Sequence, residues 1–489
     1  MKQNIYLEKR ECYQYPESDD GFSPDKLYPE YPFSESTLSS RHNEVYDMVR
    51  MALYGLGLDS KNFGSVEWNP LGDYVGKNSY ILIKPNFVNH ENPEGGLDCT
   101  VTHPSVLRCI IDYCVIAGAK IIEVADAPIQ NCDFDKLMII HGYKKVFGFF
   151  SDNDINIEVT DLRMTISQRL PNGVFLQEKH SDIYGKKTCE FDLKELSFFN
   201  TLYGKQNYGV ANYSDEAINL HHNNGHHKYL VSKSVLEADL IINLPKPKTH
   251  RFAAITGAQK NFIGICSDKE YLPHFRSGSP ETKGDEYDQS TLLNKIISKL
   301  NKQRCLHIDN NNYKMQLFYI KLIELIKRIA KVFFIKEQKY SSGQWYGNDT
   351  IWRTTLDLNL IAMYGDSSGS INLNKAPRNI LNIGDLIIAG EKNGPLQPLP
   401  KKLGIILASD NCVIFDYIFC KITGFDFKII PTIKHSITSH YLLSRLFDEI
   451  ILYSNLNKYN KVQINSDFEF PKEWNFIPHP LWNEVLQKE

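Results

Sequence analysis

The sequence lacks the features that would place it in several large classes of protein. Its formal net charge of -3 over 489 residues provides neither a basic field for nucleic acid nor the acidic excess of a disordered chain. No run of about 20 apolar residues occurs, so we expect no membrane-spanning helix. Residues 1–20 contain no apolar segment of the signal-peptide type, and we therefore expect a cytoplasmic protein.

Cysteine pairs and common catalytic signatures are also missing. None of the ten cysteines forms a CxxC pair, and several lie in apolar runs, as Cys109 and Cys114 do in "VLRCIIDYCVIAG". This usage is typical of reduced cysteines in a core. No GxGxxG follows a predicted strand, and GxxxxGK[ST] and HExxH do not occur. "GDSSGS" is only a superficial glycine loop, so the chemistry has to be sought in other clusters.

Patterning divides the chain into four parts. We expect an N-terminal arm and helix over 1–73 and an α/β core over 74–265 and 350–450. A variable helical insertion is expected over 266–349, and a C-terminal tail over 451–489. In the core, the short apolar runs at 79–88, 119–126 and 239–245 predict strands. A helix is predicted over 102–120, with Thr102 as its cap, which makes a β-α-β unit and favours a mostly parallel sheet with flanking helices.

Polar side chains follow four of the predicted strands. In open α/β sheets ligands bind beyond the carboxyl ends of strands, and lysines and amides at that edge suit a phosphate or a carboxylate. We expect His250 to be an acid/base group, and Lys248 or Lys260 to be a base or a covalent amine. The expected ligand-binding residues are Lys84, Asn86, Lys246, Thr249, Asn261, Asn393 and Gly394. Asp126 and Glu391, with Asp357, could hold a divalent metal beside the anion.

Two further segments allow more than one interpretation. The histidine-rich "HHNNGHH" (221–227) is dense enough for Zn²⁺ or Ni²⁺, but its spacing is not that of a structural zinc motif, which favours a solvated loop. The predicted helix 314–337 is basic and amphipathic. It could pack on the domain, pair with another subunit, or make peripheral contact with an anionic membrane.

The order of four blocks resembles one known family. "ILIKPNFV", "TVTHPSVLRCIIDYCVIAGAKIIEVADAP", "ADLIINLPKPKTHRFAAITGAQKNFIG" and "GEKNGPLQPLPKKLGIILASDNCVIFD" are similar to the DUF362 family, a family without an assigned activity. Many members carry a ferredoxin-like domain with cysteine runs that this chain lacks, so no iron–sulfur cluster is expected. Glu391 stands where the family often has glycine. The segment "WRTTLDLN" (352–359) resembles members associated with surface-polysaccharide biosynthesis, which points to sugar or nucleotide-sugar chemistry.

Three hypotheses about function follow. The first is an enzyme that acts on an anionic, phosphorylated or carboxylated metabolite at the strand ends. The second is a non-catalytic protein that docks on a partner or a membrane surface. The third is a metal or nickel-pincer enzyme. An oligomer is compatible with each of them.

Overall fold

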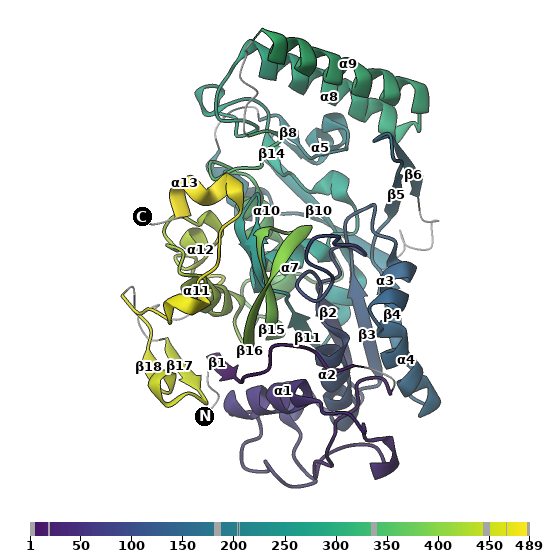
Figure 1. Cartoon of the computed structure of the whole chain (residues 1–489), viewed down its shortest axis with the longest axis vertical. Coiled ribbons are helices and arrows are strands. Elements are labelled where there is room, and N and C mark those ends of the chain that lie inside the picture. Colours follow the sequence, from purple (N-terminus) through teal and green to yellow (C-terminus); the bar gives the residue numbers. More distant parts are fainter. Residues whose placement is uncertain are drawn as a thin grey trace.

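The computed structural model describes residues 5–17, 20–179, 187–202, 204, 206–333, 340–443, 450–465 and 467–486. Its centre is an 11-stranded sheet with the order β18-β17-β1-β16-β15-β11-β2-β3-β4, and β12 and β13 extend from β15 (Figure 1). The strands are β1 Ile5–Lys9, β2 Tyr80–Pro85, β3 Ile121–Asp126, β4 Glu158–Asp161, β11 Leu240–Leu244, β12 Lys248–His250, β13 Ala254–Thr256, β15 Asn379–Asn393, β16 Gln397–Ser409, β17 Ile451–Ser454 and β18 Val462–Gln463.

The middle of this sheet is parallel, and its strands β11, β2 and β3 are buried on both faces. β15, β11, β2, β3 and β4 run parallel to one another. On β2, Ile81 and Ile83 belong to one apolar core and Leu82 to the other, as expected when successive side chains point to opposite faces. Burial of both faces explains why β11, β2 and β3 are largely apolar runs in the sequence. The prediction of an α/β fold with a mostly parallel sheet is confirmed.

Helices cover both faces of the sheet. One core includes α1 Glu44–Gly55, α2 Pro104–Ile116, α3 Phe134–Ile140 and α4 Tyr143–Asp152. The opposite core includes α6 Lys233–Glu237, α7 Ala258–Asn261, α10 Ile351–Tyr364, α11 Cys412–Thr423, α12 Pro431–Ser436 and α13 Asn483–Leu486. None of the described helices combines the length and the apolar character that crossing a bilayer requires.

Small sheets and a helical hairpin lie outside this core. The small sheets pair β5 Thr165–Arg169 with β6 Phe175–Lys179, β7 Thr188–Asp192 and β9 His222–Asn223 with β10 His226–Ser232, and β8 Tyr208–Gly209 with β14 Phe275–Arg276. Between β8 and β9 lies α5 Asp215–His221. The insertion contains α8 Leu292–Asp309 and α9 Tyr313–Val332, which form a hairpin at the end of the molecule opposite α1 (Figure 1). α9 corresponds to the helix predicted over 314–337, of which residues 334–337 lie outside the described residues.

The start of α2 corrects one prediction. The N-cap is His103, whose ring nitrogen Nδ1 accepts from the backbone N–H of Ser105, and not Thr102. Thr102 has a different task, because its hydroxyl donates to the carbonyl of Leu244 at 2.7 Å and accepts from the N–H of Asn86 at 2.9 Å. Thr102 thereby ties the loop after β2 to the end of β11.

Both ends of the described chain take part in the central sheet. β1 pairs with β16 and with β17, which comes from the segment that we expected to be a tail. Trp482 is fully buried, and its indole N–H donates to the carbonyl of Arg251 at 2.9 Å. The C-terminal segment therefore helps to position the chain beside the candidate site.

Arg108 joins the N-terminal arm to α2. Its guanidinium is fully buried, pairs with Asp112 at 3.0 Å and donates to the Gly21 carbonyl, to Ser23 and to Tyr31. We expect Arg108→Met to lower the free energy of unfolding by about 3–5 kcal/mol, because Asp112 would be left as a buried charge without its cationic partner. Urea denaturation checks this, with the exposed Arg328→Met expected to stay within about 0.5 kcal/mol of wild type. Equal effects of the two substitutions would contradict the role of Arg108.

Candidate functional site

The carboxyl ends of β2 and β3 meet in a buried ion pair. Lys84 Nζ lies 2.6 Å from Asp126 Oδ1, and both side chains are at most 4% exposed. The second oxygen of Asp126 accepts from the N–H of Phe87 at 2.7 Å. A Cβ atom at Gly264 would stand 2.0 Å from Asp126 Oδ1, so only glycine fits there. Lys84 and Asp126 therefore lie together at the strand ends, as predicted, but they form an ion pair with each other and not with a ligand.

Lys248 is enclosed by oxygen atoms. Its Nζ donates to Asn86 Oδ1 at 2.5 Å, to the Thr100 carbonyl at 2.6 Å and to the Lys246 carbonyl at 3.1 Å. Burial, with the charge of Lys246, holds the pKa of Lys248 well below its usual range. Asn86 also bonds to Asn261: the side-chain amide N–H of Asn86 donates to Asn261 Oδ1 at 2.8 Å. Both asparagines thus order the wall around Lys248.

Lys246 points away from this group. Its Nζ pairs with Asp385 at 2.9 Å and donates to the hydroxyl of Tyr15 at 2.6 Å. The same tyrosine donates to the other oxygen of Asp385 at 2.5 Å, and the N–H of His103 donates to that carboxylate as well. Lys246 is therefore part of a closed network that joins the arm, β15 and the start of α2.

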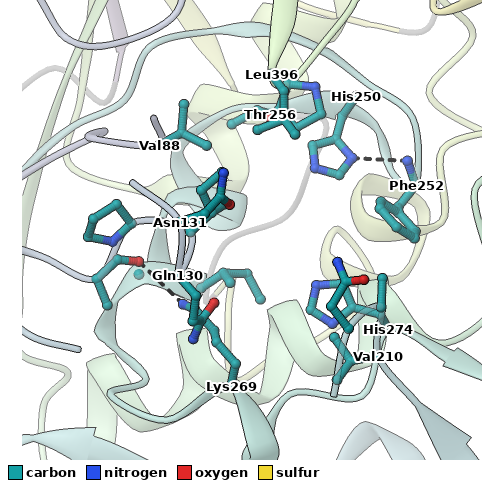
Figure 2. A pocket seen from close by; sticks show the side chains of 18 of the residues that line it. Val88, Gln130, Asn131, Val210, His250, Phe252, Thr256, Lys269, His274 and Leu396 are labelled. Carbon is teal, nitrogen blue, oxygen red and sulfur yellow. Dashed lines mark hydrogen bonds between the residues drawn. The ribbon is translucent and has the colours of Figure 1, made fainter. Parts of the chain in front are cut away.

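A cavity of about 260 Å³ lies at the edge where these strands end. Six of the predicted residues line it: Asn86, Asp126, Lys248, His250, Lys260 and Asn261. Arg251, Lys269 and His274 also face it, and apolar side chains such as Val88, Val210, Phe252 and Leu396 complete the wall (Figure 2). The densest part of the sequence motif therefore does face a cavity.

His250 is a hydrogen-bond donor toward the cavity. Its Nδ1 accepts from the backbone N–H of Phe252 at 3.0 Å (Figure 2) and from that of Ala253 at 3.2 Å. Nδ1 therefore carries no proton, and the neutral ring carries its proton on Nε2. Burial, followed by the charge of Lys260, holds the pKa of His250 well below its usual range. This refines the expected acid/base role, because the ring can polarise a ligand oxygen but is a poor base.

His274 has the opposite tautomer. Its Nδ1 lies 2.8 Å from the carbonyl of Leu272 and donates to it, which leaves the lone pair on Nε2 free. Burial and the nearby Lys260 lower the pKa of His274 to about 3. The cavity thus holds one neutral imidazole that donates and one that accepts.

Lys260 is the expected catalytic lysine with the most open surroundings. Burial, with a contribution from Lys269, lowers its pKa to about 7. No hydrogen bond or ion pair holds its amine among the described residues. At neutral pH, Lys260 is therefore a mixture of ammonium and free amine, in contrast to Lys248 within its ring of oxygens.

Two cations of the site were not singled out from the sequence. Arg251 stands inside the motif next to His250, and Lys269 follows it in the variable segment. Burial lowers the pKa of each. Lys269 donates only to the carbonyl of Ala127, at 3.3 Å, and neither residue has a carboxylate partner in the described ranges. A basic residue in a short polar stretch gives no sign of facing a cavity, so no sequence signal identifies Lys269.

The remaining predicted residues lie at the tip of the β15-β16 hairpin or, for Thr249 of β12, against it, outside the cavity wall. Thr249 donates to the carbonyl of Lys392 at 2.9 Å, and a Cβ atom at Gly394 would stand 1.9 Å from the Thr249 carbonyl. Asn393 donates to Glu94 at 3.2 Å, and Glu391 accepts from the N–H of Ile477. These contacts dock the hairpin tip, and only its next residues, Pro395 and Leu396, reach the cavity.

The expected metal pair has no geometric support. Asp126 is occupied by Lys84, and Glu391 stands at the distant hairpin tip. Asp357 accepts from Ser197, from the N–H of Phe198 and from Tyr229, and burial raises its pKa to about 7. The helix start after Gly257 is filled as well, because the carboxylate of Asp416 accepts from the N–H groups of Ala258 and Gln259.

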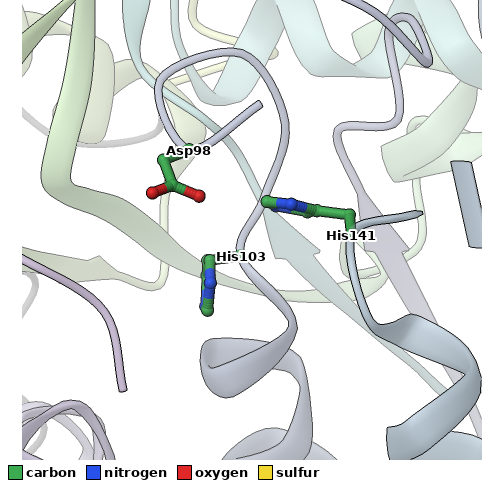
Figure 3. A group of neighbouring side chains, drawn as sticks. All are labelled: Asp98, His103 and His141. Carbon is green, nitrogen blue, oxygen red and sulfur yellow. The ribbon is translucent and has the colours of Figure 1, made fainter. Parts of the chain in front are cut away.

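Histidines elsewhere form two different arrangements. In 221–227, His221 stacks on Tyr271, His226 pairs with Asp192, and His222 and His227 are buried opposite each other on the paired strands β9 and β10. In the described part of the chain, one group of metal-ligating side chains lies close together: Asp98, His103 and His141 (Figure 3). It lies on the loop between β2 and α2 and at the end of α3.

The "GDSSGS" segment shows no catalytic geometry. Residues 365–370 form an exposed turn between α10 and β15, in which Asp366 accepts from the backbone N–H groups of Ser368 and Ser370. No strand-to-helix elbow presents a serine there, although the letters fit the spacing GxSxG.

Fold and cavity define an α/β protein with a cation-lined pocket at the carboxyl edge of its parallel strands. The chain belongs to the family described as "Domain of unknown function (DUF362)", which matches residues 81–184 and 204–421. No curated protein matches the sequence. A crystal structure of a Thermotoga maritima protein, a structural-genomics target, is similar at 9% identity with a TM-score of 0.32, covering 77% of this chain. This chain spans 58% of that protein's length.

The lowered pKa of Lys260 is testable by competitive labelling. A surface lysine has a pKa of about 10.4 and is almost wholly protonated at pH 7, whereas about half of the Lys260 amines are neutral there. Trace acetylation with acetic anhydride, followed by peptide mass spectrometry, should show Lys260 labelling rising through a midpoint near pH 7. Exposed Lys375 is the internal control, and its labelling is compared with that of Lys260 at each pH. A Lys260 profile that tracks Lys375 would exclude a free amine.

Proposed function

We propose that the chain binds a phosphorylated or carboxylated small molecule in this cavity and acts on it as an enzyme. The observation that carries the proposal is the set of three cations, Arg251, Lys260 and Lys269, around one cavity without a carboxylate partner in the described ranges. Burying an unpaired charge is costly, and an anionic ligand would offset that cost.

The other polar atoms of the wall favour the same ligand class. Gln130 Nε2 and the hydroxyl of Thr256 are buried and have no hydrogen-bond partner in the described structure. Both can donate, as can His250 Nε2–H. Donors of this kind, together with three cations, are complementary to the several acceptor oxygens of a phosphate or a carboxylate. The apolar side chains beside them suit the uncharged part of the ligand.

Lys260 and His250 are the groups that we propose for the chemistry. A lysine with a pKa near 7 can act as a general base or as a covalent amine. His250 would stabilise developing charge on a ligand oxygen, as a neutral imidazole held in one tautomer can. Sugar-phosphate or nucleotide-sugar substrates are a proposal supported by the family resemblance alone, because the segment 352–359 lies within buried α10.

Ligand binding is testable with simple anions. We expect phosphate, pyrophosphate or citrate to raise the melting temperature of the wild type above its value in chloride of equal ionic strength. A ligand at 100 times its Kd stabilises by about 2.7 kcal/mol. Lys269→Met and Arg251→Met should abolish the shift, while the exposed Lys375→Met should keep it.

The melting temperature without ligand separates a ligand site from a structural role. If Lys269 serves the ligand, removing its unpaired charge should leave the ligand-free protein as stable as wild type or more so. A lower melting temperature together with an intact anion shift would show that Lys269 only supports the fold. No anion shift in the wild type would contradict the proposal itself.

A second proposal is that the α8-α9 hairpin docks on an anionic membrane surface. Residues 292–333 contain nine Lys and Arg against two Asp and Glu. On α9, the exposed apolar residues Phe318, Leu325, Ile329 and Val332 follow one stripe of the helix, and Val332 is 72% exposed. The exposed cations Lys314, Lys321 and Arg328 flank that stripe. Apolar side chains beside a row of cations are typical of helices that lie in a bilayer interface.

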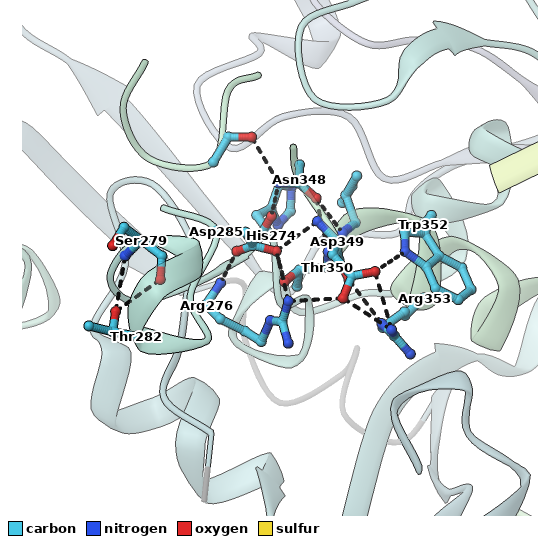
Figure 4. Close-up of polar contacts among 12 residues, drawn as sticks. His274, Arg276, Ser279, Thr282, Asp285, Asn348, Asp349, Thr350, Trp352 and Arg353 are labelled. Atoms are coloured by element: carbon cyan, nitrogen blue, oxygen red, sulfur yellow. Dashed lines mark hydrogen bonds and ion pairs between the residues drawn. The ribbon is translucent and has the colours of Figure 1, made fainter. Parts of the chain in front are cut away.

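The insertion that carries this hairpin is firmly attached to the core. Asp285 accepts from the N–H of Asp349 and from the hydroxyl of Thr350, and Arg276 donates to Asp349 at 2.9 Å (Figure 4). Arg353 of α10 donates to the same Asp349 carboxylate. Docking the hairpin would therefore orient the whole molecule on the surface.

Vesicle sedimentation tests the membrane proposal. Wild type should bind vesicles containing phosphatidylglycerol and not pure phosphatidylcholine, with binding reduced by salt. Lys321→Ala with Arg328→Ala should weaken binding about fivefold per charge, since each cation near the surface contributes about 1 kcal/mol. Phe318→Ser should weaken it too, and Leu220→Ser, which changes an exposed leucine on α5, should not.

Two results would overturn docking on a membrane. Equal binding to charged and neutral vesicles would exclude an anionic surface as the occupant. A dimer in solution that Phe318→Ser dissociates would identify a second copy as the occupant. A cytoplasmic location is also a proposal, and it is supported by the ten cysteines, all of them free.

A further inference from the structure

Asp98, His103 and His141 form a cluster that the anion site does not use. Each offers one donor atom, and the three donor atoms lie within 4.8 Å of one another (Figure 3). Asp98 comes from the loop after β2, His103 from the N-cap of α2 and His141 from the C-cap of α3. Three separate segments therefore bring one carboxylate and two imidazoles to one point.

The ring of His103 is held in place by its neighbours. It stacks on Tyr15 with 3.8 Å between ring centroids and meets Phe22 edge-on at 5.3 Å. Its Nδ1 accepts from the backbone N–H of Ser105 at 3.2 Å, which places the proton of the metal-free ring on Nε2. A metal on Nε2 requires the other tautomer, in which Nδ1–H donates to the Ser105 hydroxyl 2.8 Å away, as a ligating histidine donates its second ring N–H.

His141 supplies an observation independent of this clustering. Its Nε2 is buried and has no hydrogen-bond partner among the described residues. A buried polar atom left without a partner costs about 1–3 kcal/mol, so its retention calls for an explanation. Burial lowers the pKa of His141 to about 3 and holds that of His103 well below its usual range, so both rings are neutral at pH 7. Neutral rings have a lone pair available for a metal.

We propose that Asp98, His103 and His141 bind a divalent transition metal such as Zn²⁺. Two imidazoles and one carboxylate suit Zn²⁺, Fe²⁺ or Ni²⁺ better than Mg²⁺, which prefers oxygen ligands. A zinc ion with bonds of about 2.0–2.1 Å keeps its ligand atoms about 3.4 Å apart, so the cluster has to contract on binding. Asp98, which is partly exposed, is free to supply that movement.

The position of the proposed metal site suggests a structural role for the metal. The same loop provides Asn86 and Thr100, whose oxygens enclose Lys248 in the cavity wall. The backbone N–H of His103 donates to Asp385, the partner of Lys246. A metal at Asp98 and His103 would thus brace the loop that forms one side of the anion cavity. The metal would not coordinate the anion, and it would not take the anion's place in the cavity.

Metal binding is measured directly on the full-length protein. After EDTA treatment, the chain is titrated with Zn²⁺ and with Co²⁺, and bound metal is counted by mass spectrometry of the elements. We expect one equivalent per chain and a visible Co²⁺ spectrum of a four-coordinate site. Asp98→Asn and His141→Gln should each weaken binding at least about tenfold, since even the loss of a supporting residue costs that much.

The matched control is His226→Gln, which changes the histidine that pairs with Asp192 in the other cluster. It should bind metal as the wild type does. Metal-free His141→Gln should melt at the temperature of metal-free wild type, which shows that the loss is of a ligand and not of the fold. No retained metal, binding that survives both substitutions, or binding lost only in His226→Gln would each overturn the proposal. None of these results depends on anion binding.

Discussion

The ion pair between Lys84 and Asp126 is the interaction on which the site depends. It closes the carboxyl ends of β2 and β3, and both partners are almost fully buried. A buried pair is tolerated only when the remaining hydrogen bonds of its members are made, and here the carbonyl of Pro85 and the N–H of Phe87 make them. Gly264 brings the chain after α7 directly onto the pair. Because Asp126 is already paired with Lys84, any further cation at the same edge of the sheet needs another partner.

The lysines and the arginine at this edge are therefore divided by what surrounds them. Lys246 is neutralised by Asp385, and Lys248 is enclosed by the oxygens of Asn86, Thr100 and Lys246. Arg251, Lys260 and Lys269 line the cavity together with Lys248, but they have no carboxylate partner in the described ranges and no such ring of oxygens. Two of these five cations thus have their partners within the fold. The other three have no carboxylate partner, and an anionic ligand can supply the missing negative charge.

Much of the core could be predicted from the sequence, because local patterns determine it. The apolar runs of β2, β3 and β11 and the periodicity of α2 are visible in the letters, and so is the polar chemistry at the strand ends. The division among the lysines could not be predicted, since the partner of Lys246 lies 139 residues away and Tyr15 reaches it from the arm. The cap of α2 is His103 and not the predicted Thr102 for the same reason: the contacts of Thr102 are with β11 and Asn86, and not with its own helix. Lys269 could not be predicted, because the local sequence around a single lysine does not show whether that lysine is exposed or buried.

The surface hairpin and the cavity are connected through one groove. A groove of about 1130 Å³ is lined by Ile323 and Lys327 of α9 on one side, and it shares Arg251, Phe175 and Leu396 with the cavity. α9 thus presents its apolar and basic stripe outward while its inner face borders the path to the cations. If the outer face rests on an anionic membrane, the path to the cavity opens beside that membrane. The mixed polar lining of the groove suits a hydrated, extended ligand better than an acyl chain, so a membrane-bound molecule would enter by its polar end.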